Sequence, residues 1–83
     1  PSLRARMLLA QARAKILAAD GAAARPLLVA ATALDGVPPE AHFWLGEVTS
    51  AVDTPAARAA YERYIALAPS GEFVARARRA IAP

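Results

Sequence analysis

The sequence predicts an all-α fold of five helices, arranged as tandem antiparallel helix-turn-helix repeats in a single domain over residues 1–83. Three observations support this prediction. Alanine, the residue with the strongest helix preference, accounts for 24 of the 83 residues. Helix start and stop signals divide the chain into five segments. Segments in the two halves of the chain also resemble each other at nearly constant spacing, which is typical of repeat architectures.

Two helices are predicted in the first half. Ser2 can cap a first helix that runs to about residue 19, where Asp20-Gly21 provides a break. A second helix covers about residues 22–34 and ends before Gly36. Pro26 falls near its first turn, where proline is tolerated because the N–H that it lacks has no helical partner.

Three more helices are predicted in the second half. The third begins at Pro38-Pro39 and fades at about residues 52–53. Thr54 is predicted to cap the fourth, with Pro55 at its first position and Pro69 after its end. A fifth helix is predicted from Ser70 to Ile81.

Self-comparison relates the two halves. Residues 5–16, ARMLLAQARAKI, align without a gap with residues 41–52, AHFWLGEVTSAV, at a spacing of 36 residues. This alignment pairs Met7 with Phe43 and Ala10 with Gly46. The second and fourth segments align at a spacing of 33 residues, which pairs Leu28 with Tyr61. The pattern predicts one repeat over about residues 3–36, a second over 38–69 and a capping helix over 71–82.

The second unit resembles the tetratricopeptide repeat. Leu45-Gly46, Ala57, Tyr61 and Pro69 stand at the offsets where that family has Leu-Gly, Ala, an aromatic residue and Pro. His42 and Thr49 depart from the pattern, since they occupy the family's Trp and Tyr positions. The resemblance implies an α-solenoid of paired helices, in which small residues such as Gly46 lie where two helices cross closely.

The resemblance also implies a binding groove. In this family the first helix of each repeat lines a concave surface that receives a peptide or a partner's helix. The positions carried over are Arg4, Met7, Gln11 and Lys15 in the first unit, and Glu40, Phe43, Glu47 and Ser50 in the second. Phe43 and Met7 could anchor an apolar side chain. A solvated helix face on which Lys15 neutralises Glu47 explains the same residues and remains the alternative.

These features predict a non-enzymatic protein-interaction module within a larger bacterial scaffold or adaptor protein. The alanine- and arginine-rich usage suggests the bacterial source. One alternative is a structural or dimerisation spacer without a specific ligand. Another is electrostatic binding of nucleic acid, through the C-terminal basic residues Arg76, Arg78 and Arg79 with Arg63. No aromatic residues interleave these arginines for base stacking, so a solvated outer face is the favoured interpretation of them.

Other classes of function find little support in the sequence. The chain has no cysteine and therefore no disulfide or thiolate site. No apolar run approaches the roughly 20 residues that cross a bilayer, so we expect no membrane insertion. His42 has no second metal ligand at helical spacing, and no nucleophile–base pair, phosphate loop or cofactor motif is visible. Trp44 is expected to pack against a neighbouring helix, and a cytoplasmic or periplasmic location is expected.

Overall fold

The computed structural model describes residues 2–83, and within this range the chain forms five α-helices and no strand, which confirms the all-α prediction. The helices are α1 (Ser2–Leu17), α2 (Gly21–Thr32), α3 (Glu40–Thr49), α4 (Thr54–Leu67) and α5 (Val74–Ile81). None of the helices in this range is long and apolar enough to pass through a membrane.

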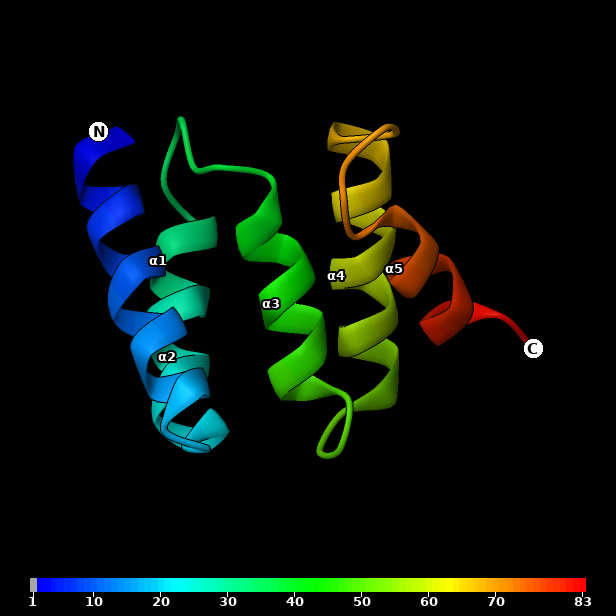
Figure 1. The fold of residues 1–83 in the computed structure, drawn as a ribbon, viewed down its shortest axis with the longest axis horizontal. Helices are drawn as coiled ribbons and strands as arrows, with labels where there is room; N and C mark the ends of the chain where they lie inside the picture. Colours follow the sequence, from blue (N-terminus) through cyan, green and yellow to red (C-terminus); the bar gives the residue numbers. More distant parts are fainter. Residues whose placement is uncertain (1) are drawn as a thin grey trace.

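The helices form a row of antiparallel hairpins (Figure 1). Helix α1 packs on α2 and α3 packs on α4, while α2 contacts α3 and joins the two hairpins. Helix α5 packs on α4 at the far end of the row. Each helix therefore lies beside its neighbours in sequence, so α1 and α5 occupy opposite ends of the molecule.

Two hydrophobic clusters hold the row together. The first lies between the hairpins and is rich in alanine, which lets the helices approach closely; its buried members are Leu9, Ala12, Ala24, Leu28 and Ala41. The second joins α3, α4 and α5 and is aromatic; its buried members are Phe43, Ala57, Tyr61, Tyr64 and Ala77. The half-buried Trp44 packs against both clusters.

An aspartate begins the second helix of each hairpin. The Asp20 carboxylate accepts a hydrogen bond from the Ala23 N–H at 3.1 Å, and Asp53 does the same for Ala56 at 3.1 Å. The prediction that Thr54 caps α4 is therefore wrong by one residue. Asp53 has a non-helical backbone, which turns its carboxylate toward the free N–H groups, whereas Thr54 already lies inside the first turn.

The end of α1 also differs from the sequence expectation. The left-handed residue is Ala19, with φ of 59°, and Gly21 is instead the first residue of α2. The Asp20 N–H donates to the Lys15 carbonyl at 2.8 Å and the Ala19 N–H donates to Ile16 at 2.9 Å. This pair of bonds is a Schellman motif, in which glycine is the usual left-handed residue.

The start of α5 was predicted too early. The helix begins at Val74 rather than after Ser70, because the Phe73 N–H donates to the Tyr64 hydroxyl at 3.0 Å and the preceding turn is held against α4. A side chain at Gly71 would collide with that hydroxyl. The Pro38-Pro39 start of α3 agrees with the structure, since the Ala41 N–H donates to Pro38 at 3.0 Å.

Two other helix ends come earlier than predicted. Helix α2 ends at Thr32, whose hydroxyl donates to the Leu28 carbonyl at 2.8 Å, and α3 ends at Thr49. The capping role predicted for the Ser2 side chain lies outside the part of the chain that the structure describes.

Gly46 is expected to be essential for packing between α3 and α4. A β-carbon there would lie 2.9 Å from two ring carbons of Tyr61, whose ring is buried and whose hydroxyl is bonded to Glu47. We predict that Gly46→Ala lowers the free energy of unfolding by about 1–2 kcal/mol, the overpacking cost less the gain in helix preference. Urea denaturation followed by circular dichroism measures this change. Gly21→Ala is the control, because its β-carbon meets Val48 at an ordinary 3.7 Å and should not destabilise the fold.

Ala19 is a site where glycine should stabilise the protein. Its positive φ strains an L-residue, and glycine removes this strain at some cost in chain entropy. We predict that Ala19→Gly raises the free energy of unfolding by about 0.5–1 kcal/mol. In the control Ala18→Gly the same substitution is made one residue earlier, where the N–H still donates to the Ala14 carbonyl. This control variant should be less stable than the wild-type protein. Equal effects of the two substitutions would contradict the assignment.

Candidate functional site

Phe43, predicted to anchor a ligand in the groove, is instead fully buried. Its ring stacks on Phe73 with a centroid distance of 4.5 Å and an interplanar angle of 6°. Trp44 meets it edge-on at 5.1 Å, and Tyr61 and Tyr64 approach it from α4. The segment leading into α5 thus covers the surface where a groove was expected. The anchoring role predicted for Phe43 is contradicted, because no face of its ring is open to a partner.

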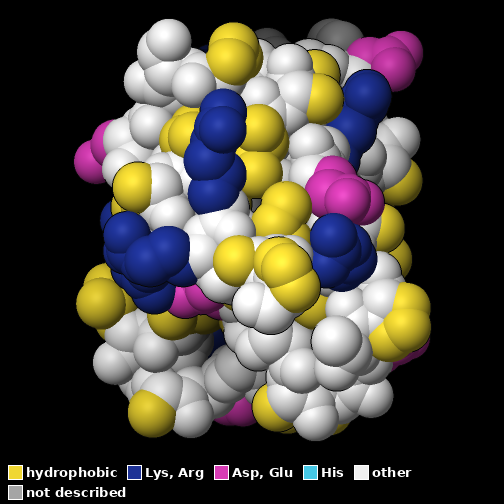
Figure 2. Space-filling view, turned by 90° about the vertical axis from the view of Figure 1, so that its right-hand side faces the viewer, with side chains coloured by type: hydrophobic (Ala, Val, Ile, Leu, Met, Phe, Trp, Pro, Cys, Tyr) yellow, Lys and Arg dark blue, Asp and Glu magenta, His cyan; other side chains and the backbone are white. Residues whose placement is uncertain are grey.

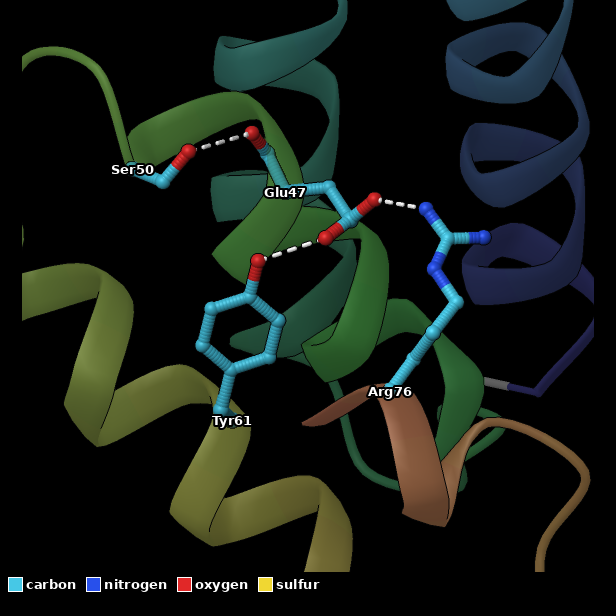
Figure 3. Close-up of polar contacts among 4 residues, drawn as sticks. All are labelled: Glu47, Ser50, Tyr61 and Arg76. Atoms are coloured by element: carbon cyan, nitrogen blue, oxygen red, sulfur yellow. Dashed lines mark hydrogen bonds and ion pairs between the residues drawn. The ribbon is translucent and has the colours of Figure 1, made fainter. Parts of the chain in front are cut away.

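Glu47 lies beside this cluster and joins three helices (Figure 3). The Tyr61 hydroxyl on α4 donates to one carboxylate oxygen at 2.6 Å, and the Arg76 guanidinium on α5 pairs with the other. Ser50 is exposed, and its hydroxyl donates to the Glu47 carbonyl at 3.1 Å. Both Glu47 oxygens are therefore engaged within the chain, which fits a role in holding α3, α4 and α5 together.

The electrostatics of Tyr61 follow from this arrangement. Burial raises the pKa of the Tyr61 phenol above its ordinary value, and the hydrogen bond to the negatively charged Glu47 raises it further. The Arg76 charge opposes this shift to a smaller extent. The phenol thus stays protonated and remains a donor to Glu47 at neutral pH.

Trp44 and Glu40 form a second contact on α3. The Trp44 indole N–H donates to the Glu40 carboxylate at 3.4 Å, and the indole meets the Phe73 ring edge-on at 5.3 Å. The Arg13 guanidinium of α1 lies 5.4 Å from the indole centroid, within the range of a cation–π interaction. Trp44 packs against neighbouring helices as expected, and it is only half-buried.

The two halves of the predicted groove differ in burial. On α1 the four carried-over side chains, Arg4, Met7, Gln11 and Lys15, are all exposed. At 100° per residue they point away from the buried side of α1, which Ala5, Leu9 and Ala12 form against α2. On α3, Phe43 is buried and Glu40 and Glu47 are half-buried and bonded within the chain, so only Ser50 of that set is exposed.

An exposed apolar seam on α1 escaped the sequence interpretation. We call the set Leu3, Met7, Ala10, Ala14 and Leu17 the α1 seam. Its members follow one another by four, three, four and three residues, which is the core spacing of a coiled coil. All five are exposed, and the three large ones are 62%, 55% and 88% accessible. The 4-3-4-3 spacing was visible in the sequence, but the tetratricopeptide register assigned Met7 to a groove instead.

The repeat spacing shows that the α1 seam is unusual. Met7 and Ala10 align with Phe43 and Gly46, and in α3 those two residues are buried, with Tyr61 of α4 packed over Gly46. Helix α1 instead packs on α2 through its opposite side. The side of α1 that corresponds to the covered side of α3 is therefore the uncovered one.

Basic side chains border the α1 seam. Arg6 and Arg13 stand at one border, in the positions just before the seam residues Met7 and Ala14, and Arg4 stands at the other. All three are exposed. In coiled coils these bordering positions form the salt bridges between helices that select the partner.

The C-terminal arginines do not form a continuous basic surface. Figure 2 shows the α4–α5 end, where basic side chains are spread among apolar and uncharged ones and acidic side chains lie beside some of them. Arg76 is engaged by Glu47, and Arg58 pairs with Glu62 and donates to the Ile81 carbonyl.

His42 is the single histidine of the chain. Its burial, followed by the charge of Arg63, lowers the pKa of the imidazole. Within residues 2–83 there is no cluster of three or more His, Cys, Asp or Glu suited to a metal ion.

Comparison of this chain with family models, curated proteins and solved structures finds no match. The resemblance to the tetratricopeptide repeat therefore rests on the sequence motif of residues 38–69 and not on a known relative.

The Tyr61–Glu47 hydrogen bond should give the protein a measurable alkaline sensitivity. Tyr61→Phe removes a charge-assisted bond and should cost about 1–2 kcal/mol at neutral pH. Folding raises the pKa of Tyr61 above its ordinary 10.0, so the phenol ionises in the unfolded chain before it ionises in the folded one. The contribution of this hydrogen bond to the free energy of unfolding is therefore fully present well below pH 10.0 and decreases as the pH rises above that value. Chemical denaturation across this pH range should show the gap between wild type and Tyr61→Phe narrowing. A constant gap would contradict the assignment.

Proposed function

We propose that this chain is a non-enzymatic protein-interaction module of the tetratricopeptide type, part of a larger bacterial scaffold or adaptor protein, and that it binds a partner helix along the α1 seam. The observation that carries the proposal is the α1 seam itself: Leu3, Met7 and Leu17 are large, apolar and exposed on one side of a helix. Exposed apolar patches that are rimmed by polar residues mark interaction surfaces.

A helix is the partner structure that this spacing favours. Side chains that repeat every 3.5 residues on average lie in a narrow line along a helix, and another helix covers such a line most closely. The second hairpin supports this choice, because there the corresponding side of α3 is packed against helix α4. The tetratricopeptide assignment is supported by the small Gly46 under the Tyr61 ring, as that family's pattern implies.

Selection from a displayed library of amphipathic helical peptides tests the proposal. The baits are the wild-type chain, Met7→Glu and Val29→Glu. Met7 lies at the α1 seam, while Val29 is similarly exposed, at 53%, in a shallow apolar hollow on α2 with Ala22 and Pro26. We expect wild type and Val29→Glu to retain the same peptides, and Met7→Glu to lose about tenfold or more in affinity because it places a charge in the apolar contact.

Two outcomes would contradict the proposal. Peptides that bind Met7→Glu as tightly as wild type but lose affinity for Val29→Glu would move the interface to α2. A library from which wild type selects nothing would argue for a spacer. Circular dichroism and urea denaturation of both variants show that a loss of binding is not a loss of fold, and both positions are exposed enough to accept the charge.

A further inference from the structure

We propose that the partner on the α1 seam is an acidic amphipathic helix, with apolar residues at coiled-coil spacing and glutamate or aspartate on both sides of them. This inference rests on the proposed function and specifies the chemistry of the partner. It is carried by the charges that border the α1 seam and by the absence of acidic residues in the helix that presents it.

The charges along α1 are all of one sign. Residues 1–19 contain four basic residues, Arg4, Arg6, Arg13 and Lys15, and no aspartate or glutamate. Among the described residues, the ion pairs join Arg58 to Glu62 and Arg76 to Glu47, so the α1 cations take no part in them. Arg13 is held near the Trp44 ring, which orients its guanidinium but leaves its charge uncompensated.

The borders of the α1 seam are positioned to meet a partner's carboxylates. The five seam residues span roughly 80° of the helix circumference, and Arg6 and Arg4 stand on its two sides. With 16 residues, α1 is about 24 Å long, which matches two to three heptads of a partner. A helix lying in the α1 seam would bring its own bordering residues beside these arginines, where opposite charges attract and like charges repel.

The same charges disfavour other occupants. A second copy of α1 would offer apolar contacts but no acidic residue at its borders, so no salt bridge could form there between two copies. An anionic membrane would attract the cations. However, membrane-surface helices use a wide apolar face with large side chains, whereas the α1 seam is narrow and two of its five members are alanine.

Three synthetic peptides of equal length test the proposal by fluorescence anisotropy. The first has leucine at the seam-facing positions and glutamate beside them, the second replaces glutamate by lysine, and the third keeps glutamate but has serine in place of leucine. We expect the first to bind about tenfold or more tightly than each of the others, with affinity falling as salt is added. Arg4→Glu with Arg6→Glu should reverse the preference toward the lysine peptide. Arg78→Glu with Arg79→Glu, both exposed on α5, controls for the same change in net charge.

The outcomes separate the partner chemistry from the proposed function. If the two leucine peptides bind equally well, and Met7→Glu abolishes the binding of both, the acidic chemistry of the partner is overturned. The proposal that the α1 seam binds a helix would still stand. Without peptide binding, a dimer in sedimentation equilibrium that Met7→Glu dissociates would assign the α1 seam to a second copy. Met7-dependent binding to phosphatidylserine vesicles in the absence of peptide binding would assign it to membranes. No binding in any arm would defeat both proposals.

Discussion

The burial of Phe43 is the constraint on which the second half of the molecule depends. Its ring lies in a space bounded by Trp44, the two α4 tyrosines and Phe73, and the stacking of Phe73 on it fixes where the chain enters α5. A buried aromatic residue of this size contributes several kcal/mol through apolar area and edge contacts. Covering it requires α5 to lie against α4. The position of α5 is therefore a consequence of covering Phe43 rather than of any local preference of its own sequence.

The polar contacts around Phe43 follow from its burial. Once α5 lies across the cluster, Arg76 is brought to Glu47 and lies 5.2 Å from the Phe43 ring centroid, while Tyr61 approaches the same carboxylate from α4. The Glu47 contact with Arg76 is partly exposed and contributes little by itself, but the hydrogen bond to the buried Tyr61 specifies how the three helices meet. Phe43 and Glu47, which the sequence predicts as ligand contacts, thus position helices instead.

The two hairpins use the same helix pattern in different ways. In α3 the side that contains Phe43 and Gly46 is covered, and the other side packs on the first hairpin, so α3 is enclosed from both directions. Helix α1 stands at the end of the row and has only α2 to pack against extensively among the described residues. Its uncovered side keeps apolar residues in a line between basic ones. This asymmetry leaves an apolar line bordered by cations at one end of the row, and it is the observation on which the proposed helix binding rests.

The sequence by itself determined the number of helices and the approximate places where they break, because alanine content and the positions of glycine and proline act within a few residues of chain. It also indicated that Gly46 lies where α3 and α4 cross closely. The end of α1 was not predicted, because an L-residue such as Ala19 rarely adopts a positive φ. The start of α5 was not predicted either, because the turn before it is held by the Tyr64 hydroxyl of α4. Only the tertiary structure decided which side of each helix is covered. The 36-residue alignment equates Met7 with Phe43, yet one is exposed and the other buried, because burial is set by the neighbouring helices and not by the residue's place in the repeat.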